Sequence, residues 1–88
     1  MIYAITYDLK TPGQDYSALY ATIHNLGETL HPLQNLWLLN TGSGLNSVRD
    51  QLRTVIDQND FVFVAQLYKS SYSAWMPVTA HEWLEARL

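Results

Sequence analysis

The sequence predicts a single α+β domain, spanning residues 1–88, with a ferredoxin-like fold. The chain is too short for a second domain. Its apolar and turn patterns follow the order β-α-β-β-α-β and then add one short helix. Two split β-α-β units of this length are typical of a four-stranded antiparallel sheet with both helices on one face.

The first strand and the first helix have clear boundaries. Residues 2–9 are mainly β-branched and aromatic, and they end at the turn residues 10–13. Asp15 is a good N-cap, and Gly27 stands where a glycine commonly follows a helix. Between them, apolar residues recur at helical spacing: Tyr16, Leu19, Tyr20, Ile23 and Leu26.

A hairpin is expected next. Residues 28–33 and 36–41 read as two strands that turn at Gln34 and Asn35. Pro32 cannot donate a backbone hydrogen bond, so the first of these strands belongs at an edge of the sheet.

The rest of the chain predicts a helix, a strand and a terminal helix. Asn46 or Ser47 caps a helix with an apolar stripe of Val48, Leu52, Val55 and Ile56. Residues 61–68 form an apolar strand, and 69–74 are irregular. Thr79 and Glu82 have the spacing of a capping box, which starts a helix that runs to about Arg87.

Alternation along the strands predicts two apolar sheet faces. The face expected under the helices holds Tyr3, Ile5, Tyr7, Leu9, Phe61, Phe63, Ala65 and Leu67. The opposite face holds Ile2, Ala4, Thr6, Asp8, Val62, Val64, Gln66 and Tyr68. The second set is less polar than a solvated sheet face, so we expect a second copy of the chain to cover it in a homodimer.

Composition limits the classes of function. The net charge is −3 and there is no cysteine, which excludes disulfides and thiolate metal sites. Nucleic-acid binders usually carry a basic stripe. Arg49 and Arg53, four apart on one helix, are the nearest approach to a stripe, and with Lys10 they are weak candidates for nucleic-acid contacts. A solvated helix face is the alternative. Neither a signal sequence nor a membrane span is recognisable, so the expected location is the cytoplasm.

Asp8 is the main candidate for chemistry, with two interpretations. It ends a central strand on the face assigned to the subunit contact, where a two-fold axis would bring two carboxylates together. Such a pair repels unless a proton or a cation such as Mg²⁺ lies between the carboxylates, and Mg²⁺ held there would serve phosphodiester hydrolysis. Alternatively, Asp8 accepts backbone hydrogen bonds in a turn through Lys10 and Thr11.

Other features have weaker functional interpretations. His81 and Glu85 have the spacing of a metal pair but lack a third ligand, while His24 and His31 have no visible partner. The segment 41–44 resembles a phosphate cradle without the ending of a P-loop, and a flexible connection is the alternative. Tyr68, Tyr72, Trp75 and Trp83 would either stack on nucleobases or pack the terminal helix or a dimer.

The opening Met-Ile-Tyr-Ala-Ile-Thr-Tyr-Asp-Leu resembles the small CRISPR-associated spacer-acquisition nuclease family. Residues 8–16, 36–38 and 75–83 look closer to its compact SinR-like relatives. The resemblance implies a homodimer of ferredoxin-like subunits, with an aspartate at the end of the first strand that faces its dimer mate and binds Mg²⁺. By position, this aspartate is Asp8. Family members usually have more basic residues after the aspartate, whereas here only Lys10 follows.

Three hypotheses of function follow. The first is a metal-dependent nuclease in which Asp8 from two subunits holds Mg²⁺. The second is a non-catalytic dimeric module that binds a partner protein through the aromatic tail and the sheet edges. The third is a ribonuclease toxin similar to the virulence-associated protein D family, which has the same fold.

Overall fold

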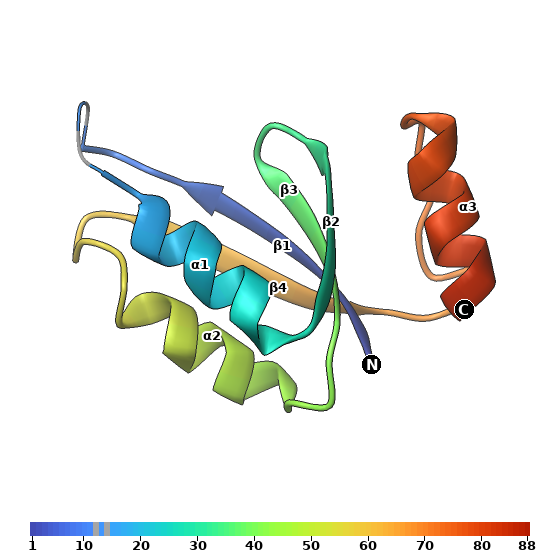
Figure 1. Cartoon of the computed structure of the whole chain (residues 1–88), viewed down its shortest axis with the longest axis horizontal. Coiled ribbons are helices and arrows are strands. Elements are labelled where there is room, and N and C mark those ends of the chain that lie inside the picture. The colour runs from blue at the N-terminus through green and yellow to red at the C-terminus, as the bar shows by residue number, and fades with distance from the viewer. Residues whose placement is uncertain (12, 14) are drawn as a thin grey trace.

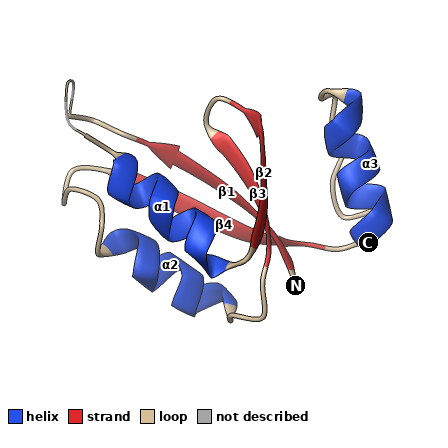
Figure 2. Cartoon of the chain, viewed as in Figure 1, coloured by secondary structure: helices blue, strands red, loops and turns tan. Residues whose placement is uncertain are grey.

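The computed structural model describes residues 1–11, 13 and 15–88. It has seven elements in these residues: β1 (Ile2–Asp8), α1 (Ser17–Leu26), β2 (Glu28–Leu33), β3 (Leu36–Asn40), α2 (Leu45–Arg53), β4 (Phe61–Leu67) and α3 (Val78–Arg87) (Figures 1 and 2). The predicted α+β class and order of elements are confirmed. Pro12, in the predicted turn, and Gln14 lie outside the described residues. No helix of the described part of the chain is both long and apolar enough to cross a membrane.

The four strands form one antiparallel sheet in the order β2-β3-β1-β4. The helices α1 and α2 cover one face of this sheet, while α3 lies apart from them at one end (Figures 1 and 2). Nine buried side chains fill the space between the sheet and α1 and α2: Tyr3, Ile5, Tyr7, Leu19, Ile23, Trp37, Leu39, Val48 and Leu52. Burying a side chain such as Leu or Ile stabilises a fold by about 1.5–3 kcal/mol, so this layer is the main core.

The prediction of which β4 side chains face the helices is wrong. Phe61 and Phe63 were expected under the helices, but they are 63% and 66% exposed on the other face. In the antiparallel register, Tyr7 pairs with Val62, and residues that pair directly project from the same face. Tyr7 is in the core, so Val62 joins it and the two phenylalanines face outward. Both sets of alternating β4 residues are largely apolar, so the sequence could not show which set faces the helices.

The helix α3 and the segment before it cover one half of the opposite sheet face. Ile2, Leu38 and Leu84 form a second buried cluster, each no more than 5% exposed. Leu30, Leu67, Tyr72, Met76 and Trp83 pack against this cluster. The expectation that a second copy covers this whole face is therefore wrong for this half, because the chain's own C-terminal segment covers it.

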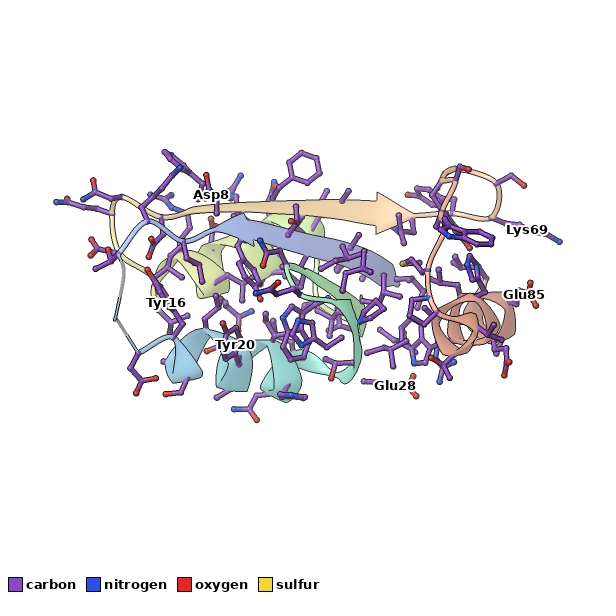
Figure 3. All side chains as sticks on the ribbon, turned by 90° about the horizontal axis from the view of Figure 1, so that it is seen from above. Asp8, Tyr16, Tyr20, Glu28, Lys69 and Glu85 are labelled. Carbon is purple, nitrogen blue, oxygen red and sulfur yellow. The ribbon has the colours of Figure 1, made fainter. Side chains whose placement is uncertain are left out.

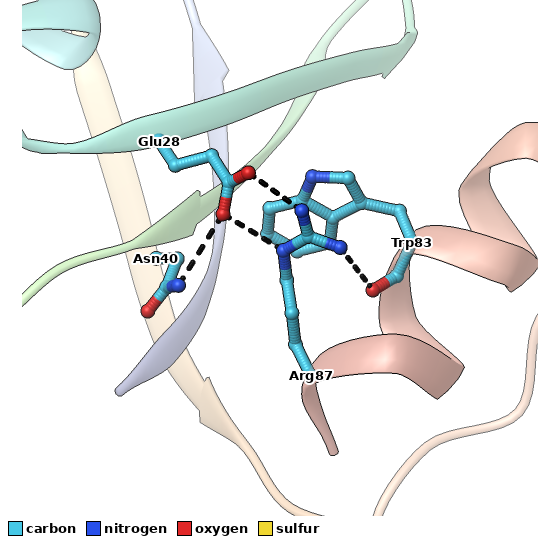
Figure 4. Close-up of polar contacts among 4 residues, drawn as sticks. All are labelled: Glu28, Asn40, Trp83 and Arg87. Atoms are coloured by element: carbon cyan, nitrogen blue, oxygen red, sulfur yellow. Dashed lines mark hydrogen bonds and ion pairs between the residues drawn. The ribbon is translucent and has the colours of Figure 1, made fainter.

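Arg87 ties α3 to the edge of the sheet (Figure 4). Its guanidinium donates to both carboxylate oxygens of Glu28 on β2, at 2.8 and 2.5 Å, and to the carbonyl oxygen of Trp83 at 2.9 Å. It also lies 4.2 Å from the centroid of the Trp83 ring, within cation–π range. The hydrogen bonds from Arg87 and then from Asn40 hold the pKa of Glu28 at about 2. This clamp fixes the covering helix to β2.

The helix ends differ from the predicted caps. The Asp15 carboxylate accepts the Ser17 N–H at 2.9 Å, which lowers the pKa of Asp15, and α1 begins at Ser17. The predicted capping box at Thr79 is wrong, because α3 begins at Val78 after Pro77 and has no side-chain cap. Proline is compatible with this place because the N–H groups at the start of a helix have no acceptor within the helix, so the missing N–H of Pro77 costs no helical hydrogen bond.

Gly27 is needed for close approach of two backbone segments. A Cβ atom there would lie 2.1 Å from the carbonyl oxygen of Asn40. The glycine therefore lets the chain leave α1 and pair at once with the end of β3.

Candidate functional site

The half of the second sheet face that α3 leaves uncovered forms an exposed patch, which we call the open patch. It consists of Thr6, Asp8, Leu33, Leu36, Phe61 and Phe63. Cross-strand pairing brings these residues together, since Thr6 lies between Leu36 and Phe63, and Asp8 is opposite Phe61. Figure 3 shows Asp8 at the layer of the strands and Tyr20 at the layer of the helices, on α1. The open patch is an apolar surface with one carboxylate at its end.

The carboxylate of Asp8 has no structural role that the described contacts reveal. Its side chain is 64% exposed, and its partner is the Lys10 ammonium at 2.6 Å. The N–H of Lys10 donates instead to Asp60, and that of Thr11 donates to the Tyr16 hydroxyl. The alternative interpretation of Asp8 as a turn acceptor for these two groups is therefore wrong.

Asp60 holds the chain in place where it leaves β1. Its buried carboxylate accepts the Lys10 N–H at 2.7 Å, the Tyr16 hydroxyl at 3.0 Å and the Asp57 N–H at 2.9 Å. Burial is the largest single influence on the pKa of Asp60 and raises it, but these three hydrogen bonds together lower the pKa below its usual value. Asp60 thereby fixes the backbone that carries Asp8 and Lys10. From the sequence, Asp60 was expected in a polar loop, and its hydrogen bonds were not predicted.

The predicted cations fall in two places. Lys10 is beside Asp8, while Arg49 and Arg53 line a pocket of about 430 Å³ at the start of β4. We call this the edge pocket; it is lined by Arg49, Arg53, Ile56, Asp57, Gln58, Asp60, Phe61 and Val62. Arg49 also contacts the Asp50 carboxylate at 2.9 Å. Phe61 and Val62 line both the edge pocket and a shallow pocket that contains Asp8.

Asp8 is a potential metal ligand at the open patch. Within the described residues, no three His, Asp or Glu side chains are placed to share an ion. Asp8 offers the oxygen ligands that Mg²⁺ prefers, but it is a single carboxylate already next to a cation. The described residues thus offer Mg²⁺ one carboxylate at the open patch.

The histidines contact structural partners. The Nε2 atom of His81 accepts the Met76 N–H at 3.2 Å, and this contact holds the segment before α3. The rings of His24 and His31 lie 5.0 and 4.0 Å from that of Trp37, His31 in a parallel stack. These aromatic contacts between α1, β2 and β3 were not predicted from the sequence, because they depend on which way each side chain points from its helix or strand.

The remaining candidates divide between structural and exposed positions. In the segment 41–44, the Ser43 N–H donates to the Thr41 hydroxyl, which in turn donates to the Leu26 carbonyl oxygen. This segment is thus held by internal hydrogen bonds. Tyr72 and Trp83 pack on the covered half of the sheet, whereas Tyr68 and Trp75 are 59% and 98% exposed. No known protein-family model matches this chain.

Proposed function

We propose that this chain is a metal-dependent nuclease that works as a homodimer of ferredoxin-like subunits. Two copies face each other through their open patches and bring two Asp8 carboxylates together. The observation that carries the proposal is the position of Asp8: it is exposed at the end of β1, within an apolar surface, and the backbone groups of the nearby turn use other acceptors. The strand order β2-β3-β1-β4 supports the ferredoxin-like arrangement.

The apolar part of the open patch supports the dimer. Phe61 and Phe63 on β4 and Leu33 on β2 are each more than 40% exposed on one sheet face. Leu36 on β3 and Thr6 on β1 lie between them and connect the two edges of the sheet. Contiguous exposed apolar surface of this kind usually marks an interface. A two-fold contact would place the same residues on both sides and remove them from water.

Each residue has a distinct role in this proposal. The two Asp8 carboxylates hold Mg²⁺, which supplies charge to polarise a phosphodiester when it is bound. Lys10, at 2.6 Å from Asp8 in the isolated chain, is then free to contact a phosphate oxygen. Asp60 acts as a positioning residue because it fixes the Lys10 backbone.

The test is cleavage of labelled single-stranded RNA, single-stranded DNA and duplex DNA with Mg²⁺ or Mn²⁺. We expect Asp8→Asn to abolish cleavage, while Asp50→Asn, an exposed acid on α2, retains it. All three proteins are purified in parallel so that a contaminating nuclease appears in each of them. Equal cleavage by the wild type and Asp8→Asn would refute the assignment.

A second candidate is a non-catalytic module that binds a partner protein. The exposed Trp75 favours it, because a tryptophan that is 98% exposed is typical of a recognition residue. Absence of cleavage by a correctly folded wild-type protein would support this candidate over the nuclease. The ribonuclease toxin is a variant of the first proposal and would cut RNA alone.

A further inference from the structure

The two edges of the sheet differ in their protection against pairing with another strand. On the β2 edge are a charged residue, Glu28, the proline Pro32, and a register shift between Leu30 and Leu33. These features are known to block strand addition. At the other edge, β4 is a seven-residue strand, Phe-Val-Phe-Val-Ala-Gln-Leu, without charge, proline or glycine. The backbone groups on its outer side are therefore a template for another strand.

We propose that β4 pairs antiparallel with β4 of a second copy of this chain, and that Tyr68 of each copy enters the edge pocket of the other. A two-fold axis at Val64 pairs all seven residues of the strand. Phe63 then lies opposite the partner's Ala65, and Phe61 lies opposite the partner's Leu67. The larger side chain meets a smaller one in both pairs, and no like charges meet because the strand has none.

The position of Tyr68 makes this register specific. Its ring is 59% exposed, and its backbone is fixed by the turn after β4, where its N–H donates to the Ser71 hydroxyl at 2.8 Å. Alternation along the strand directs it to the same side as Val62 and Val64, which is the side of the edge pocket. In the proposed register, Tyr68 is opposite the partner's Asp60, a lining residue of that pocket.

The edge pocket has the chemistry to hold a tyrosine. Ile56 and Val62 offer apolar contact to the ring, and Arg53 and Asp57 offer polar groups to the hydroxyl. Tyr68 follows the end of β4, and the edge pocket lies at the start of β4. Antiparallel pairing of two β4 strands therefore brings each Tyr68 next to the edge pocket of the other copy. The partner copy thus completes a site that one chain leaves empty.

The edge contact joins the backbones of two β4 strands, whereas the proposed contact of the open patch joins two sheet faces; Phe61 and Phe63 belong to both regions. Pairing of the two β4 strands leaves both open patches on the same side of a joined eight-stranded sheet. The two contacts are compatible in one tetramer, and either can form alone. The inference therefore does not rest on the proposed nuclease activity.

Disulfide trapping tests the register, because the natural chain has no cysteine. We expect the double variant Phe63→Cys/Ala65→Cys to form covalent dimers on oxidation, since these positions are paired across the two-fold axis. The matched control Phe61→Cys/Ala65→Cys carries two cysteines on the same face that the register does not pair. Covalent dimers only in the first variant support the inference, whereas dimers in both, or in neither, overturn it.

Sedimentation tests the role of the tyrosine. We expect Tyr68→Ala to raise the dissociation constant of the edge contact by about tenfold or more, as truncation of a buried interface tyrosine commonly does. Trp75→Ala removes another exposed aromatic outside β4 and should leave that constant unchanged. A wild-type chain that stays monomeric at concentrations on the order of 100 μM would overturn the inference, as would equal dissociation constants for both variants.

Discussion

The two halves of the second sheet face carry similar residues but have different surroundings. In the covered half, Ile2 and Leu38 lie under α3 and are almost completely buried. In the open patch, Phe61 and Phe63 lie on the same face and are about two-thirds exposed. The difference is that α3 and the segment before it pack on only one half of this face. Apolar residues in the first half hold the fold together, and those in the second are available for another molecule.

The largest expected change in the free energy of unfolding comes from a substitution in the covered half. Leu84→Ala should lower the free energy of unfolding by about 2–5 kcal/mol, because it leaves a cavity between α3 and the sheet. Urea denaturation at fixed protein concentration measures the change. A loss below about 0.5 kcal/mol, the usual scale for surface sites, would mean that α3 contributes little to the fold.

A smaller effect is expected from the clamp between Glu28 and Arg87. The pKa of Glu28 is about 2 in the folded chain and near 4.5 without the clamp, so its contribution is complete above pH 4.5 and is lost as the pH falls towards 2. Both groups are solvent-accessible, which weakens the pair. Glu28→Gln should therefore lose less stability than the wild type between pH 6 and pH 3, while Glu85→Gln, a change of an exposed acid on α3, should behave like the wild type.

The smallest effect on stability is expected in the open patch. Phe63→Ser should change the free energy of unfolding of the monomer by no more than about 0.5 kcal/mol, since the ring is already 66% exposed. It should nevertheless weaken self-association, which sedimentation measures. A large loss of monomer stability would show that Phe63 belongs to the core, and the comparison between the two halves would fail.

The sequence predicted the elements better than it predicted the surfaces. Periodicity and turn residues located every helix and strand to within a few residues, because those signals are local. The pairing of Tyr7 with Val62 could not be predicted, since it depends on a strand about fifty residues away. The cover of Ile2 by Leu84 depends likewise on contacts distant in sequence.

The candidate site was predictable only in part. Asp8 was chosen as a candidate because it was expected to end an apolar strand, and it is the last residue of β1. The aromatic neighbours Phe61 and Phe63 were assigned to the wrong face, so the open patch was not foreseen. The hydrogen bonds of Asp60 were missed as well, because a loop aspartate gives no sign of burial in the sequence.

The three tryptophans give the protein an internal set of optical probes. Trp37 is 4% exposed in the core, Trp83 lies beside Arg87 at the clamp, and Trp75 is almost completely exposed. Indole emission moves to shorter wavelength when water is removed from the ring. Variants that keep one tryptophan each would therefore give separate signals without an added dye. These signals would report on the core, on the packing of α3 against the sheet, and on the binding of another molecule at Trp75.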